Sequence, residues 1–279
     1  MNAFTAAGAM TQLSPAHLAQ GPAPLHRRQA MWIHPERLVY VGLVGQPSPR
    51  TLGSYTLYLS LDRPHRLLMD GTEHTAWLSV VPPYACHQLS SDRGTICALL
   101  IEPESVDLGH ALAFMRMCDQ AEDVPDALRR SVDCFIESPG YGFGDTQKFD
   151  NFFFGQCLAE RKVDPRIHHV LRAVQDRPEG QISAADCAAR IHLSVSRFLH
   201  LFKSEIGISF RHYRAWKRAR SILRCVTQQA NMVDIALDAG YPDSSHFSHS
   251  MRRYYGLSPR SIFMGSRKLT LLDGAAATV

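Results

Sequence analysis

The chain has 279 residues, of which 45% are hydrophobic and 20% charged, which is typical of globular proteins with buried cores and excludes collagen-like or largely disordered chains. No apolar run reaches the ~18 residues that span a membrane, and no basic region followed by an apolar one indicates a secretory signal. The formal net charge of +4 conceals an asymmetry: residues 1–160 carry 11 Lys and Arg against 17 Asp and Glu, whereas residues 161–279 carry 19 against 9.

This asymmetry predicts two domains, of which only the second, basic one has a polyanionic partner. The cysteines favour reduced thiols in a cytoplasmic protein over a disulfide framework, because their number is odd and no CxxC pair occurs. They are Cys86, Cys97, Cys118, Cys134, Cys157, Cys187 and Cys225.

Residues 1–29 are rich in Ala, Gln and Pro without a sustained period, so we expect a flexible leader. Residues 30–104 contain several short runs of β-branched and aromatic residues, which predict a small barrel or sandwich. The runs cover residues 38–41, 55–59, 66–69, 77–81 and 95–101, and Asp70-Gly71 is a favoured hairpin turn after the third of them.

Residues 105–162 change to a helical spacing of apolar residues. Two helices are expected around Leu108, Leu112 and Met115 and around Leu128, Val132 and Phe135, with a third after the glycine-rich break at 139–144. Their apolar faces suit either a dimer interface or packing on the β-domain, and the sequence leaves both possibilities open.

The basic half contains one pattern twice, about 49 residues apart. Each copy begins with a helix that carries a small residue, Ala188 or Ala236, where a second helix can approach closely. Four residues later, His192 or Gly240 stands where the turn favours a left-handed backbone.

A polar cap then opens the second helix of each copy, and a glycine ends it. The caps are Ser194 in the first copy and Asp243 or Ser244 in the second; the glycines are Gly207 and Gly256. Ser183 and Asp186 form a capping box at the start of the first copy. The pattern predicts two helix-turn-helix units, with second helices at about 195–206 and 244–255 and a connecting helix at about 209–226.

Together these two units resemble the DNA-binding domain of the AraC/XylS family of transcription regulators, over roughly residues 165–266. Phe210 and Met251 depart from residues frequent in that family, without changing the pattern. The resemblance implies an α+β protein: a leader (1–29), a small cupin-like sensor β-barrel (30–104), a helical linker or dimerisation region (105–162), an all-α double helix-turn-helix domain (163–268) and a tail (269–279).

The second helix of each unit is expected to enter the major groove of DNA. The residues expected to contact bases are Ser196, Arg197, Leu199 and His200 on the first, and Ser244, Ser245, His246, Ser248 and His249 on the second. Those expected to contact phosphates are Lys203, Arg218, Arg220, Arg252 and Arg253.

In the predicted barrel, His87, Tyr84, Tyr58 and Trp77 are candidate effector-binding residues. The segment Pro82–His87 faintly resembles a cupin motif, but no cluster of His and Glu suited to a metal accompanies it, so we expect neither a metal nor another cofactor. No nucleophile–base pair, P-loop or dinucleotide fingerprint points to an enzyme.

The resemblance implies a cytoplasmic, sequence-specific transcription regulator, with activation of transcription among its expected roles. Its expected partners are double-stranded DNA, a second copy of the chain, RNA polymerase and a small effector, with no membrane. Two alternatives remain: a cupin-type metalloenzyme with an accessory DNA-binding domain, and a regulator without ligand control.

Overall fold

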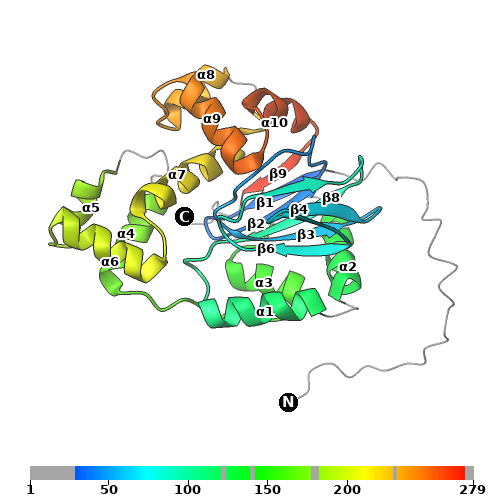
Figure 1. The fold of residues 1–279 in the computed structure, drawn as a ribbon, viewed down its shortest axis with the longest axis horizontal. Helices are drawn as coiled ribbons and strands as arrows, with labels where there is room; N and C mark the ends of the chain where they lie inside the picture. Colours follow the sequence, from blue (N-terminus) through cyan, green and yellow to red (C-terminus); the bar gives the residue numbers. More distant parts are fainter. Residues whose placement is uncertain (1–28, 121–123, 139–141, 177–181, 229–230, 274–279) are drawn as a thin grey trace, which may run out of the picture.

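A computed structural model describes residues 29–120, 124–138, 142–176, 182–228 and 231–273. Most of the expected leader, and the tail after residue 273, therefore lie outside the described residues. Strands fill the N-terminal part and helices the C-terminal part, which confirms the α+β class (Figure 1). Among the described helices, none combines the length and the apolar character needed to cross a membrane.

The β-domain consists of two sheets and not of the closed barrel that we expected. One sheet has six strands in the order β6-β3-β8-β2-β1-β9, and the other has three in the order β5-β4-β7. Strand β5 carries polar side chains that are mostly exposed to solvent, so it forms an outer edge and has no apolar face to close against another strand. The strands are β1 (Ala30–Ile33), β2 (Arg37–Gly42), β3 (Tyr55–Ser60), β4 (His65–Met69), β5 (Thr72–Ala76), β6 (Leu78–Val81), β7 (His87–Ser90), β8 (Ile96–Ile101) and β9 (Thr270–Asp273).

The tight hairpin at Asp70-Gly71 is confirmed: both residues have positive φ, 52° and 77°, and β4 pairs with β5 in antiparallel register. Strand β9 departs from expectation, since residues 270–273 were assigned to a tail. It pairs in parallel with β1, beside which it lies in Figure 1, and its two leucines alternate, so that Leu271 packs on one face of the sheet and Leu272 on the other.

Both faces of the six-stranded sheet are covered, which explains why all six residues of β8 are buried. Cys97 and Leu99 face a layer of three helices, whose phenylalanines, among them Phe149 and Phe153, pack on them. These helices are α1 (Leu108–Gln120), α2 (Val124–Glu137) and α3 (Thr146–Phe154). Of the two possibilities for residues 105–162, the structure shows packing on the sheet, while the helix α1 still exposes half of Leu108.

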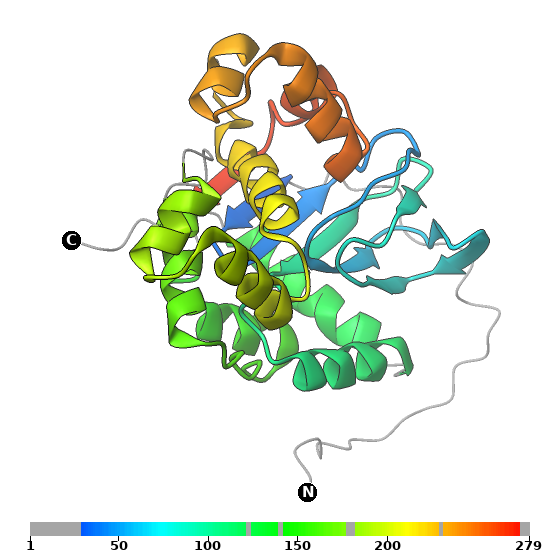
Figure 2. The ribbon, with the colours of Figure 1, turned by 60° about the vertical axis from the view of Figure 1, so that its left-hand side comes forward.

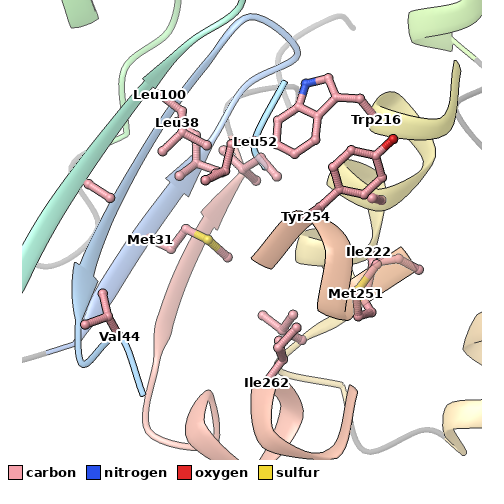
Figure 3. Close-up of a cluster of buried hydrophobic side chains, with 14 of the residues drawn as sticks. Met31, Leu38, Val44, Leu52, Leu100, Trp216, Ile222, Met251, Tyr254 and Ile262 are labelled. Atoms are coloured by element: carbon pink, nitrogen blue, oxygen red, sulfur yellow. The ribbon is translucent and has the colours of Figure 1, made fainter. Parts of the chain in front are cut away.

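The opposite face of the sheet meets the C-terminal helices. Leu38 and Leu100 of the sheet share one buried cluster with Trp216, Met251 and Tyr254 (Figure 3). The C-terminal elements are α4 (Pro165–Asp176), α5 (Ala184–Arg190), α6 (Val195–Ile206), α7 (Phe210–Ser221), the 3-10 helix η2 (Ile222–Cys225), α8 (Met232–Asp238), α9 (Ser244–Tyr255) and α10 (Pro259–Gly265).

The two helical units differ in how they are held. The first has a separate core, which includes Phe198 and Phe202, whereas the second shares its core with the sheet. Helix α7 takes part in both, because Phe210 and Tyr213 lie in the first core and Trp216 in the second. It therefore runs between the units as one packed connector (Figure 2).

Candidate nucleic-acid interface

The first unit folds as its capping residues predict. Ser183 Oγ accepts a hydrogen bond from the Asp186 backbone N–H at 3.0 Å, and the Asp186 carboxylate accepts one from the Ser183 backbone N–H at 2.9 Å. The hydrogen bonds that the carboxylate accepts from the Ser183 hydroxyl, at 2.7 Å, and from the Ser183 backbone N–H lower the pKa of Asp186. His192 adopts the left-handed backbone, with φ of 54°, and Ser194 caps α6 through the Arg197 N–H.

The second unit repeats this geometry with different side chains. Gly240 takes the left-handed position, with φ of 74°, and Asn231 caps α8. Asp243, not Ser244, caps α9, since its Oδ1 accepts hydrogen bonds from the N–H groups of Ser245 and His246, both at 2.8 Å. Gly207 and Gly256 end α6 and α9 with positive φ, as predicted.

The base-contact candidates occupy the outward sides of α6 and α9 near their N-termini. On α6, Phe198 is buried, and the exposed candidates are Ser196, Arg197, Leu199 and His200. On α9, Phe247 is buried, Ser248 is half-buried, and the exposed candidates are Ser244, Ser245, His246 and His249. The two N-termini differ in charge, because α6 begins at the neutral cap Ser194 whereas α9 begins at the carboxylate of Asp243.

His246 is the most constrained of these side chains. Its Nδ1 lies 2.8 Å from Oδ2 of Asp243, the residue that caps the same helix. The hydrogen bonds from His246 also lower the pKa of Asp243. This contact orients the ring of an otherwise exposed side chain.

The phosphate candidates divide into two groups. Lys203, Arg252 and Arg253 are exposed on the two second helices. Arg218 is half-buried, with its guanidinium 5.3 Å from the centre of the Tyr241 ring. Arg220 is the fifth candidate, and the structure contradicts its assignment, because only 3% of its surface is exposed.

Arg220 instead joins a buried ion-pair cluster that links α7 to the end of β8. Its Nε lies 2.7 Å from Oε1 of Glu102, and Lys217 Nζ lies 2.7 Å from Oε2 of the same carboxylate. Trp216 Nε1 donates to Glu102 Oε2 at 2.9 Å, and Lys217 also pairs with Glu104. The sequence does not distinguish these buried cations from exposed ones, because the carboxylate that pairs with them lies more than 110 residues away in the chain.

A cavity of about 930 Å³ lies between the six-stranded sheet and the C-terminal helices. Of the four effector candidates, only Tyr58 lines it. Trp77 lies outside it, where the Arg129 guanidinium stacks 4.6 Å from the ring centre, and Tyr84 is half-buried at a loop position with φ of 62°.

His87, the remaining candidate, is buried and positions Tyr58. Its Nδ1 donates to the Ala85 carbonyl at 3.0 Å, and its Nε2 accepts from the Tyr58 hydroxyl at 2.9 Å. Burial lowers the pKa of His87 to about 4, so the ring is neutral at pH 7 and suits this pattern. Among the described residues there is no group of three or more His, Cys, Asp or Glu side chains arranged to hold a metal ion.

Comparisons with known proteins agree with this geometry. A helix-turn-helix domain model matches residues 187–264. The chain is 27% identical over 100 residues to the transcriptional regulator MtrA of Neisseria gonorrhoeae, covering 34% of this chain and 32% of the relative. It is 30% identical over 109 residues to the transcriptional activator RhaS of Escherichia fergusonii, covering 38% of each. The chain thus spans less than half the length of these curated relatives.

A solved structure shares the fold over a longer stretch. ToxT from Vibrio cholerae O395 aligns with 83% of this chain and 98% of its own, with a TM-score of 0.53 and 14% identity. At this identity the likeness concerns the fold alone: strands at the N-terminus followed by helix-turn-helix units at the C-terminus.

Proposed function

We propose that this chain, whose C-terminal part is an AraC/XylS-type helix-turn-helix domain, is a sequence-specific DNA-binding transcription regulator that reads two neighbouring segments of the major groove. The observation that carries the proposal is the pair of capped second helices, α6 and α9, which expose polar N-terminal turns and are joined through the packed helix α7. The connector supports a fixed spacing between the two reading helices, which a flexible linker would not give.

In this proposal the exposed residues of α6 and α9 contact the bases. The phosphates are contacted by Lys203, Arg252 and Arg253. Phosphate contacts supply affinity that falls with salt, whereas base contacts supply specificity. The chain works by binding and not by catalysis, and it acts in the cytoplasm, where bacterial DNA is found.

The β-domain is the sensor in this proposal, and its cavity is the site of a small effector. The cavity supports this role because helix residues such as Tyr255 and Ile262 form part of its wall, so an occupant contacts both parts of the protein. A second copy of the chain and RNA polymerase are further proposed partners. The exposed side of α1, with Leu108 and Leu112, is the surface we propose for the second copy.

The test is a selection of binding sites from random duplex DNA with the full chain. We expect a bipartite site whose two elements lie about one helical turn, or about 10 base pairs, apart. Arg197→Ala should relax the sequence preference in one element, and His249→Ala in the other.

Lys203→Ala should weaken binding to all sequences alike and reduce the slope of log affinity against log salt by about 1. Lys148→Ala, an exposed position on α3, is the control and should leave both elements unchanged. Recovery of no site, or of a site read by one helix only, would contradict the proposal.

A further inference from the structure

The loop between β2 and β3, residues 43–54, reaches from the β-domain to the second reading helix, α9. The Thr51 backbone N–H donates a hydrogen bond to the Arg253 carbonyl at 2.9 Å. The Ser48 hydroxyl donates to the carbonyl of Gly256, the residue at which α9 ends. Carbonyls in the last turn of a helix have no partner within the helix, so donors from outside fix the position of that end. The β-domain supplies two such donors to α9.

The loop and α9 are also matched in shape. Val44 and Leu52 of the loop share one buried cluster with Met251 and Tyr254 of α9 (Figure 3). A Cβ at Gly256 would lie 3.0 Å from the carbonyl oxygen of the loop residue opposite it, so the two backbones leave no room for a side chain there. The loop is therefore packed against α9 as well as hydrogen-bonded to it.

On its other side the loop is anchored to the β-domain. Arg50 and His87 exchange two backbone hydrogen bonds, at 2.9 and 3.0 Å, and the Leu52 carbonyl accepts one from the Tyr84 N–H at 2.7 Å. Val44 and Leu52 also line the cavity between the sheet and the C-terminal helices. The loop thus forms part of the cavity wall and holds the end of α9 at the same time.

The first reading helix, α6, is held in a different way. The Glu205 carbonyl near its end accepts a hydrogen bond from Nη2 of Arg161, and Nη1 of the same guanidinium donates to the Pro103 carbonyl at 3.2 Å. Within the part of the chain that the structure describes, the buried cluster around α6 contains no residue of the β-domain. One side chain between α3 and α4 therefore takes the place that a packed loop has at α9.

The loop acts on the end of α9 that is opposite the base-contact candidates. The helix has 12 residues, which corresponds to a length of about 18 Å, and the candidates Ser244 to His249 lie in its first half. A displacement of one end of a packed helix tilts the other end. Because hydrogen bonds to base edges depend on direction, such a tilt changes which bases are preferred.

We propose that Ser48 and Thr51 are positioning residues for DNA recognition: through the loop 43–54 the β-domain sets how α9 reads its DNA element, whereas α6 is positioned independently through Arg161. The inference rests on the proposed function, in that it assigns the control of one of the two DNA elements to the β-domain.

The test uses the full chain and the bipartite site selected from random duplex DNA. The element that Arg197→Ala relaxes is the α6 element, and the one that His249→Ala relaxes is the α9 element. For each element we compare the affinity for the selected site with that for sites carrying one changed base pair. This ratio reports recognition, which a general loss of stability does not change in one element alone.

Two variants release the loop from α9. Ser48→Ala removes the hydroxyl, and Thr51→Pro removes the backbone donor at a position preceded by an extended residue, which proline tolerates. Each should lower the ratio in the α9 element by about threefold or more and leave the α6 element unchanged. Arg161→Ala should have the opposite effect. Unchanged ratios in both loop variants, or equal losses in both elements, overturn the proposal.

Ser131→Ala is the matched control. The Ser131 hydroxyl also donates to a backbone carbonyl of another element, that of Phe152 at 3.0 Å, but this bond joins α2 to α3 and lies away from the reading helices. Both ratios should stay at their wild-type values in this variant. A loss in Ser131→Ala equal to that in Ser48→Ala overturns the proposal.

Hydrogen exchange of the free protein gives a readout that needs no DNA. In Ser48→Ala and Thr51→Pro, the backbone amides at the end of α9 should exchange about threefold faster or more, and those at the end of α6 at the wild-type rate. Wild-type exchange at α9 in both variants overturns the proposal. Faster exchange at α9 without any selected site counts against the proposed function alone, and a selected site whose α9 element ignores the loop variants counts against this inference alone.

Discussion

At the residue scale, neighbouring basic side chains on α7 have different roles, decided by the direction in which each one points. Arg220 and Lys217 face the sheet and are buried against Glu102, whereas Arg211 is exposed to solvent. The spacing of apolar residues along α7 indicated that the helix has a buried and an exposed side. It could not show that the buried side meets carboxylates as well as apolar residues.

His65 is a second residue whose surroundings determine its chemistry. It is fully buried, with its two ring nitrogens 2.8 Å from the Ser60 hydroxyl and 2.7 Å from the Ser79 hydroxyl, and burial lowers its pKa to about 4. In the unfolded chain the pKa returns toward about 6.5. The unfolded state therefore binds more protons between these two values, and stability is full above pH 6.5 and falls as the pH is lowered toward 4.

We expect the wild type to lose about 1–2 kcal/mol more stability than His65→Gln when the pH is lowered from 7 to 5, because the variant lacks this titrating group. Urea unfolding at the two pH values measures the difference. His74→Gln, on the exposed edge strand β5, is the control and should keep the wild-type pH dependence. Equal losses in wild type and His65→Gln would show that His65 does not contribute.

At the element scale, the two helix-turn-helix units form the same turn with different residues. His192 and Gly240 stand at equivalent positions and both have positive φ, 54° and 74°. A side chain in this conformation costs about 1 kcal/mol, which glycine avoids. The second unit therefore has the unstrained turn, and the first stores a small strain.

Gly240→Ala should lower the free energy of unfolding by about 1 kcal/mol, because alanine must adopt the left-handed conformation. His192→Gly, its matched counterpart, should change it by less than about 0.5 kcal/mol, since relief of strain offsets the greater freedom of the unfolded chain. Chemical denaturation of both variants checks the pair. A similar loss in both would mean that the His192 side chain makes stabilising contacts that outweigh the strain.

At the scale of the whole molecule, helix α7 is packed against the β-domain through both charge and shape. The Glu102 carboxylate is fully buried and contacts Trp216, Lys217 and Arg220. The backbone of Gly53 approaches Trp216 so closely that a Cβ there would lie 2.5 Å from the ring. This contact joins α7, which connects the two units, to the β-domain.

Glu102→Ala should lower the free energy of unfolding by about 3–5 kcal/mol, because it leaves buried cations without their shared carboxylate. Lys148→Ala breaks an exposed pair with Asp145 and should cost less than about 1 kcal/mol. Denaturant titration followed by tryptophan fluorescence measures both. A loss below 1 kcal/mol in Glu102→Ala would show that the cluster is solvated or rearranges easily.

The sequence alone determined what depends on local chemistry. Side-chain caps, left-handed turns and apolar periods act over three to five residues, so the bounds of α6 and α9, the caps Ser183 and Ser194, and the hairpin at Asp70-Gly71 could all be predicted. The repetition of this local pattern in the basic half was enough to indicate the kind of domain.

Only the tertiary structure decided which distant residues meet. It placed β9 beside β1, buried Arg220 against Glu102, and joined Arg37 to Asp150 in a buried ion pair. The sequence does not show whether a single strand, carboxylate or arginine is exposed or buried. Their roles depend on burial and on partners more than 100 residues away, which no local period encodes.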